Sequence, residues 1–90
     1  MSESKRELTV KDPIGLHARP VGEIIRLVKA AGVRVSVSRP GQEPQPVESP
    51  LRMLALKVKS GEVLEFRFHD SEPGVVEQLT NEIDRLLSGE

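Results

Sequence analysis

Residues 18–38 read ARPVGEIIRLVKAAGVRVSVS, and the hydrophobic period of this stretch changes at Gly32. Before Gly32, apolar side chains recur three or four residues apart, at Val21, Ile24, Ile25, Val28 and Ala31. That spacing is typical of an amphipathic helix, which Gly32 is expected to end. After Gly32, the valines at positions 33, 35 and 37 alternate with polar residues, as in a strand with one buried face. The stretch therefore predicts a helix followed directly by a strand.

Period-two alternation predicts further strands on both sides of this stretch. Leu8 and Val10 alternate with polar residues in a first strand, which stops at the turn signal Asp12-Pro13. Residues 64–69 alternate in the same way and predict another strand. Residues 42–48 contain two prolines, which cannot donate to a sheet, so we expect a short edge strand there at most.

Two more helices are indicated by the residues at their ends. Ser49 followed by Pro50 is typical of a helix N-cap with proline in the first turn. We expect this helix to make two or three turns and to end before Gly61. A last helix is expected to begin near residues 71–72 and to end at Gly89.

The expected order of elements is therefore β-α-β-β-α-β-α. Strands with one polar face and short connections are typical of an antiparallel sheet whose other face is covered by helices, so the predicted class is α+β. Periodicity leaves the order of the strands within the sheet open, because the ferredoxin-like fold has a similar string of elements.

Length and composition limit the possible functions. The chain has 90 residues, so residues 1–90 are expected to form a single domain. A net charge of −1, together with the lack of Trp and Tyr, argues against nucleic acid as a partner. The sequence has no cysteine, no long apolar run and no apolar leader, so we expect a cytoplasmic protein without disulfides or direct membrane insertion.

The segment with the clearest chemical potential is PIGLHARP, residues 13–20, at the junction of the first strand and the first helix. His17 lies at the expected N-cap position, where the unpaired amides of a helix start favour an anion. Imidazole can be an unprotonated nucleophile near neutral pH and can attack phosphorus directly. We expect Arg19 and the amides of Ala18 and Arg19 to bind the phosphoryl oxygens. By itself, however, a histidine at a helix start is more often a cap or a surface residue.

Residues 15–20, GLHARP, resemble the active-site signature of the histidine-containing phosphocarrier protein HPr of the bacterial phosphoenolpyruvate-dependent sugar phosphotransferase system. The chain length, the order of elements and a serine at the start of the second helix are also similar to that family. The resemblance implies an open-faced β-sandwich, in which a four-stranded antiparallel sheet carries three helices on one face. It also implies that His17 accepts a phosphoryl group on its δ nitrogen from Enzyme I and donates it to sugar-specific IIA components, with Arg19 assisting and no cofactor.

Ser49, Leu51 and Leu54 are secondary candidates. Ser49 resembles in position a serine that a regulatory kinase phosphorylates in many HPr proteins, but Pro50 and the prolines before it depart from the family pattern, and a plain N-cap also accounts for it. The helix after Ser49 has too many apolar residues for one face, so some are expected to be exposed. The resemblance places Leu51 and Leu54 beside the histidine, where they would dock partners; deeper burial is the alternative.

The same residues also fit other functions. A ferredoxin-like regulatory domain could bind a small metabolite and use His17 as a cap. An adaptor of the same fold could act by docking alone, but His17 argues against it, because family members of that kind lack the histidine. An HPr-like carrier could also serve a nitrogen-related or dihydroxyacetone branch. His69 is expected to be a solvated surface residue, and no metal site is predicted. We expect a monomeric carrier that is not itself an enzyme and forms short-lived complexes with its partners.

Overall fold

The computed structural model describes residues 3–89, and its strands form one antiparallel sheet. The strands are β1 (Glu3–Thr9), β2 (Arg34–Ser38), β3 (Gln45–Pro46) and β4 (Val63–His69). Their order in the sheet is β1-β4-β2-β3, with β4 paired to both β1 and β2. β3 pairs only with β2 and forms one edge of the sheet, while β1 forms the other.

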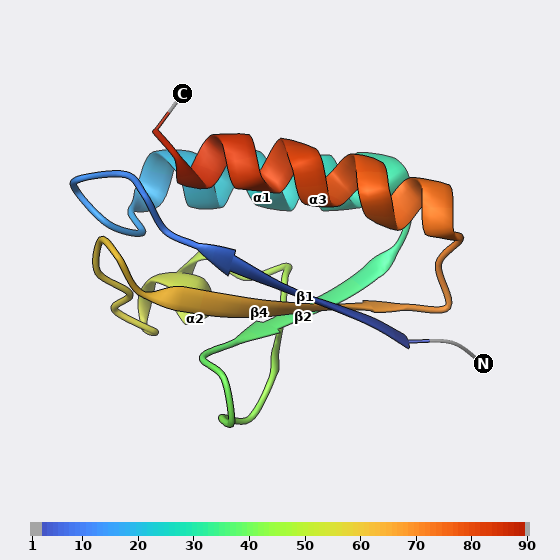
Figure 1. Ribbon diagram of the computed structural model, residues 1–90, viewed down its shortest axis with the longest axis horizontal. Helices are drawn as coiled ribbons and strands as arrows, with labels where there is room; N and C mark the ends of the chain where they lie inside the picture. The colour runs from blue at the N-terminus through green and yellow to red at the C-terminus, as the bar shows by residue number, and fades with distance from the viewer. Residues whose placement is uncertain (1–2, 90) are drawn as a thin grey trace.

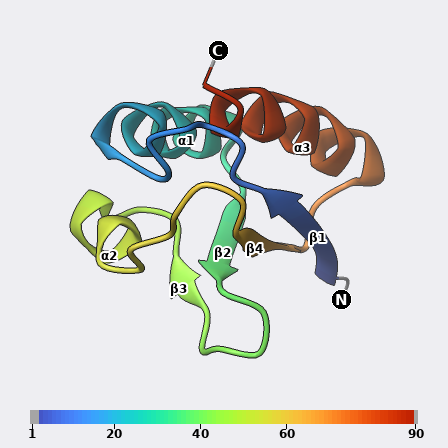
Figure 2. The same ribbon diagram turned by 60° about the vertical axis from the view of Figure 1, so that its left-hand side comes forward.

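Two long helices cover one face of this sheet. α1 (Ala18–Ala31) and α3 (Pro73–Leu87) lie side by side across it, as Figure 1 shows. The short α2 (Pro50–Leu54) lies at the end of the molecule where α1 begins (Figure 2). No helix within residues 3–89 is both long enough and apolar enough to cross a membrane.

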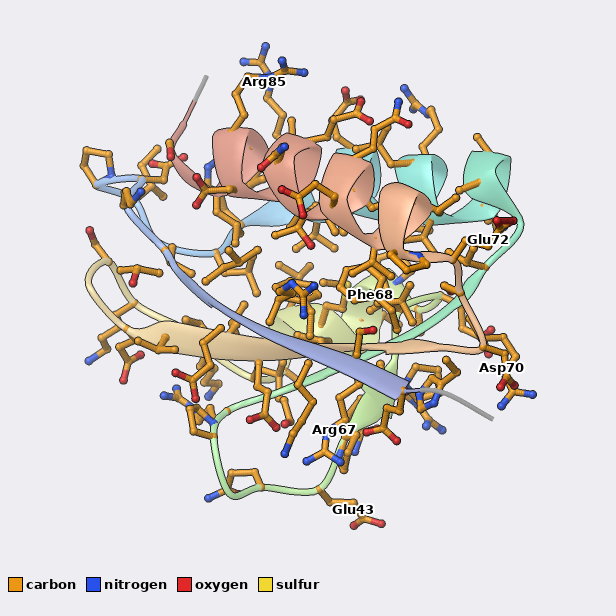
Figure 3. All side chains as sticks on the ribbon, turned by 45° about the vertical axis from the view of Figure 1, so that its right-hand side comes forward. Glu43, Arg67, Phe68, Asp70, Glu72 and Arg85 are labelled. Carbon is orange, nitrogen blue, oxygen red and sulfur yellow. The ribbon has the colours of Figure 1, made fainter. Side chains whose placement is uncertain are left out.

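A single core lies between the sheet and the helices. Ile24 from α1, Met53 from α2, Phe68 from β4 and Ile83 from α3 are all fully buried in it. Along β4 the side chains alternate, so Phe68 points towards the helices whereas Arg67 points away from them on the open face (Figure 3). All three helices therefore contribute to one hydrophobic layer, and the opposite face of the sheet carries polar side chains.

The predicted fold class and element order are confirmed. The sheet is four-stranded and antiparallel, it carries three helices, and the elements follow in the order β-α-β-β-α-β-α. α1 ends at Gly32, whose left-handed φ of 69° lets its amide donate to the carbonyls of Val28 and Lys29. β3 is the short edge strand expected from its prolines.

Two elements differ in length from the expectation. β1 begins at Glu3, because residues 3–6 continue the pairing with β4 beyond the alternation around Leu8. α2 has five residues rather than two or three turns. Lys57 has a left-handed φ of 52°, which ends any helical path and turns the buried Val58 inward. The apolar residues after Leu54 thus belong to a loop that returns towards β4.

Candidate functional site

The loop between β1 and α1 is held in place by the loop that follows α2. The Leu16 amide donates to the Val58 carbonyl at 2.9 Å, which brings the two loops into direct contact. Gly15, with a φ of 91°, sits so close to the second loop that a Cβ on it would lie 2.8 Å from the Val58 oxygen. Only glycine fits both this backbone conformation and this contact. The histidine that follows is therefore presented from an anchored segment.

His17 is the N-cap residue of α1, as predicted, and has an extended backbone with φ −136° and ψ 179°. Its side chain does not cap the helix and is about one third exposed. The Val21 amide donates to the His17 carbonyl, and Pro20 has no amide hydrogen. Within residues 3–89, the amides of Ala18 and Arg19 have no backbone or side-chain acceptor. Two free donors therefore mark the positive end of a 14-residue helix directly after the histidine.

Asp12 belongs to the site, although its sequence context indicates only a turn. One oxygen of its carboxylate, Oδ2, lies 3.0 Å from Nε2 of His17. The other oxygen, Oδ1, accepts from the Ile14 amide at 2.9 Å. These two hydrogen bonds, that of Ile14 first and that of His17 second, hold the pKa of Asp12 below its usual range. The carboxylate is therefore ionised at neutral pH although its side chain is almost buried.

The sequence contained only a weak signal for this pair. Asp12 precedes His17 by five residues and is separated from it by a proline and a glycine, so neither helical nor strand spacing relates the two. An aspartate two residues before an amide in a loop often closes a local turn, as Asp12 does with Ile14. That local role could be expected, but the approach of the second oxygen to the histidine depends on the path of the loop.

A cleft joins these groups to the start of α1 and the end of α3. It is lined by Asp12, Ile14, His17, Arg19, Pro20, Glu23, Leu86 and Gly89. The structure thus brings His17 and Arg19 into one cleft, and Arg19 is exposed there. Within residues 3–89, no three side chains of the metal-ligating types His, Cys, Asp and Glu gather closely enough to hold an ion.

The secondary candidates lie on and near α2, at the same end of the molecule as the histidine loop (Figure 2). Ser49 caps α2, and its hydroxyl accepts from the Arg52 amide at 3.4 Å. Leu51 is 79% exposed, and Ile14 in the histidine loop is 74% exposed. Leu54 is only partly exposed, because it packs against the core. The expectation of exposed apolar residues is met by Leu51, whereas Leu54 shares in the deeper burial that was the alternative.

His69 lies far from this site, at the end of β4 next to the beginning of β1. It is less solvated than expected, with about a quarter of its side chain exposed. Its Nε2 lies 3.1 Å from the Ser36 hydroxyl, and its Nδ1 lies 4.0 Å from a Glu3 carboxylate oxygen. The two histidines therefore have unrelated surroundings.

Comparison with known proteins agrees with the sequence signature and the fold. The family model described as the PTS HPr component phosphorylation site matches residues 4–85. No curated protein sequence matches the chain. Among solved structures, HPr-C-His from Thermoanaerobacter tengcongensis is similar with a TM-score of 0.76 and 22% identity, and 97% of each chain is covered.

Two further structures are similar over nearly their whole length. The phosphocarrier protein HPr from Bacillus anthracis has a TM-score of 0.77 at 14% identity, with 96% of this chain and 98% of that chain covered. A histidine-containing phosphocarrier protein from Mycoplasma has a TM-score of 0.77 at 17% identity, with 93% and 97% covered. At these identities the structural likeness establishes the HPr fold and removes the ferredoxin-like alternative. Because the family model spans most of the sequence as well, the chain belongs to the HPr family of phosphotransferase-system phosphocarriers.

Proposed function

We propose that this chain accepts a phosphoryl group on His17 from phosphorylated Enzyme I and donates it to IIA components. The observation that carries the proposal is the position of His17 at the start of α1, with the unpaired Ala18 and Arg19 amides beside it and Arg19 in the same cleft. An arriving phosphoryl group would meet two amide donors, the positive end of a helix dipole and a guanidinium. Phosphoryl transfer needs little more than such positioning and charge stabilisation.

The chain acts in this scheme as a carrier and not as an enzyme. The histidine nitrogen forms a bond to phosphorus while the bond between phosphorus and the donor breaks, and the same exchange runs again towards the acceptor. About one third of the His17 side chain is exposed, so a partner's active site can approach the ring. Its anchoring through Gly15 and Leu16 keeps the ring in one place for both partners.

Docking of both partners is proposed to use the apolar side chains around this end of the molecule. Leu51 and Ile14 are the two large hydrophobic side chains that are well exposed within residues 3–89. Exposed apolar residues beside a reactive group favour contact with a protein partner. Leu54 would support this surface from its partly buried position. The area is small, which suits complexes that form and separate quickly.

Ser49 is proposed as a regulatory phosphorylation site for a serine kinase and phosphorylase. A phosphate there would add negative charge at the start of α2, next to the docking residue Leu51, and would alter docking more than the fold. The test is incubation of the wild type and of Ser49→Ala with a serine kinase specific for HPr proteins and labelled ATP. Label in the wild type alone supports the site, and equal label in both contradicts it.

The carrier function is tested by incubation with phosphoenolpyruvate and Enzyme I, followed by measurement of protein-bound phosphate. We expect a phosphate that is labile in acid and stable in alkali, and we expect its loss in His17→Ala. His69→Ala is the matched control, because it removes the other histidine of the chain, which lies outside the cleft. Absence of label in the wild type, or unchanged label in His17→Ala, contradicts the proposal.

We propose that the carrier is a cytoplasmic, single-domain monomer. Its acceptor can be tested directly among purified IIA components. Transfer to a sugar-specific IIA component is the expected result. Transfer only to an acceptor of a nitrogen-related or dihydroxyacetone branch would assign the carrier to that branch instead.

A further inference from the structure

Every polar group of Asp12 has a defined partner, so its carboxylate is fixed in orientation. The Asp12 amide donates to the Leu87 carbonyl, and the Asp12 carbonyl accepts from the Gly15 amide, each at 2.9 Å. Oδ1 accepts from the Ile14 amide, also at 2.9 Å. Oδ2 therefore remains for His17, whose Nε2 lies 3.0 Å away.

Gly89, which follows α3, lies close against this carboxylate. A Cβ on Gly89 would lie 3.3 Å from both Cγ and Oδ2 of Asp12, and Gly89 has a left-handed φ of 87°. The Asp12 side chain keeps only 9% of its surface exposed. A carboxylate fixed and shielded in this way is a directed hydrogen-bond acceptor and is little screened by water.

The charge state of Asp12 determines which nitrogen of His17 carries the proton. An ionised carboxylate can only accept hydrogen bonds, so Nε2 must be the donor in the 3.0 Å contact. A neutral imidazole has one N–H group, and its other nitrogen has a free electron pair. With the proton on Nε2, the free pair lies on Nδ1. This nitrogen is bonded directly to Cγ and is thus the one nearer to the Cα atom of His17 itself.

We propose that Asp12 is a positioning residue, which holds the His17 proton on Nε2 and leaves the Nδ1 electron pair free to accept the phosphoryl group. This inference rests on the proposed carrier function. When Nδ1 attacks, an N–P bond forms, and the bond from phosphorus to the donor breaks with its electron pair leaving on the donor. The ring becomes cationic and keeps its proton on Nε2, facing the Asp12 carboxylate. A carboxylate that orients a catalytic imidazole stabilises the resulting cation in the same way.

A purely structural role for Asp12 would consist of closing the loop through Ile14. Asp12→Asn separates the two roles, because an amide has nearly the same size and retains one oxygen that can accept from Ile14. Its NH₂ group would then face Nε2 and donate to it. The variant therefore favours the tautomer with the proton on Nδ1 over the one with the proton on Nε2. The loop is kept, but Nδ1 no longer has a free electron pair.

The test combines ¹⁵N NMR of the His17 ring with the rate of labelling by Enzyme I and phosphoenolpyruvate. Spectra are recorded above the pH range in which imidazole titrates. We expect the Nε2–H form in the wild type and a shift towards the Nδ1–H form in Asp12→Asn. We also expect the labelling rate of Asp12→Asn to fall by about 10- to 100-fold, the size of effect found when a carboxylate that orients a metal-ligating histidine is lost. Asp84→Asn is the matched control, since it removes the same charge from a partly exposed residue outside the cleft, where, within residues 3–89, the Asp84 carboxylate pairs only with the exposed Lys11.

The outcomes of this test distinguish the positioning role of Asp12 from the proposed carrier function on which it rests. An Nδ1–H form in the wild type overturns the role of Asp12, and this measurement does not depend on whether the variant folds or on Enzyme I. Equal labelling rates in the wild type and in folded Asp12→Asn also overturn it, while the carrier function stands. If the wild type shows the Nε2–H form but takes no label, the carrier function is overturned, and the inference falls with it.

Discussion

At the scale of single residues, the site depends on a glycine that no other residue can replace. Gly15 has a φ of 91°, and a Cβ at this position would lie 2.8 Å from the Val58 carbonyl oxygen. Gly61 has the same φ of 91°, but a Cβ there would meet nothing within 4 Å. The two glycines thus separate the effect of backbone conformation from that of close contact.

We predict that Gly15→Ala lowers the free energy of unfolding by roughly 2–4 kcal/mol, whereas Gly61→Ala costs only about 1–2 kcal/mol. Both variants place a side chain at positive φ, but only Gly15→Ala also pushes against the Val58 carbonyl. Urea denaturation of the two variants measures the difference. Equal losses would show that the close approach of Gly15 to the Val58 carbonyl adds no cost beyond the positive φ.

Arg19 is predicted to affect transfer and not stability. It is exposed at the start of α1, and Arg19→Ala should change the free energy of unfolding by less than about 0.5 kcal/mol. The rate of labelling should fall by about tenfold or more, because a cation facing the transferred phosphoryl group is lost. Arg26→Ala is the control, since it removes the same charge two turns further along α1. Similar rates in the two variants would contradict the role of Arg19.

At the scale of elements, α2 divides its short length between the core and the surface. Met53 is fully buried, whereas Leu51, two residues earlier, is 79% exposed. Alanine substitutions at these two positions should therefore affect different properties, docking at Leu51 and stability at Met53. The pair separates docking from stability within a single helix.

We predict that Leu51→Ala slows phosphoryl transfer by about fivefold and leaves the free energy of unfolding within about 0.5 kcal/mol of the wild type. Met53→Ala should cost about 2–5 kcal/mol, because it leaves a cavity in the core. Under conditions where it remains folded, its transfer rate should be close to normal. The measurements are urea denaturation and the transfer rate to a IIA component. An unchanged rate in Leu51→Ala would rule out docking through this residue.

The elements also show which parts of the structure the sequence could predict. α1 was predictable to the residue, because fourteen residues repeat the helical spacing and Gly32 ends them. The length of α2 was not predictable from the sequence. After this helix, Lys57 has a left-handed conformation, and Val58 contacts the histidine loop, a tertiary contact that periodicity does not report. The strand order likewise depends on contacts between distant segments, which periodicity does not report.

The candidate site also has a part that the sequence could predict and a part that it could not. His17 could be placed at a helix start from local spacing, and its signature pointed to phosphoryl chemistry. Asp12 could not be assigned to the site, because its carboxylate reaches His17 only through the folded path of the loop and the closing contact of Gly89. Local signals therefore locate the histidine that we propose to react, whereas Asp12, which we propose to orient it, is brought beside it only by the tertiary structure.

At the scale of the whole molecule, two carboxylates couple the fold to pH. Glu62 accepts from the Arg39 guanidinium at 2.8 Å and from the Lys59 amide at 2.7 Å, and these bonds, that of Arg39 first, lower the pKa of Glu62. Arg39 also donates to the carbonyls of Leu56 and Lys57, so it ties β2 to the loop after α2. The pKa of Asp12 is lowered as well.

We predict that acid destabilises the protein partly through these two groups. A carboxylate whose pKa is lower in the folded state stabilises the fold above its ordinary pKa, and this contribution is lost as the pH falls through the folded value. The loss should therefore set in as the pH falls through the ordinary carboxyl pKa values, about 4 to 4.5. Urea denaturation at neutral pH and at about pH 3 should show a smaller acid-induced loss in Glu62→Gln and in Asp12→Asn than in the wild type. The same loss in all three proteins would exclude both groups as its source.

The central claim is that His17 carries a phosphoryl group from one protein to another, and a chase experiment tests it most directly. The chain is labelled with Enzyme I and phosphoenolpyruvate, Enzyme I is removed, and purified IIA components are added. We expect the label to leave His17 and to appear on a IIA component, and we expect His17→Ala to take up no label in the first step. Label that stays on the chain with every IIA component tested, or label that enters His17→Ala, would contradict the account.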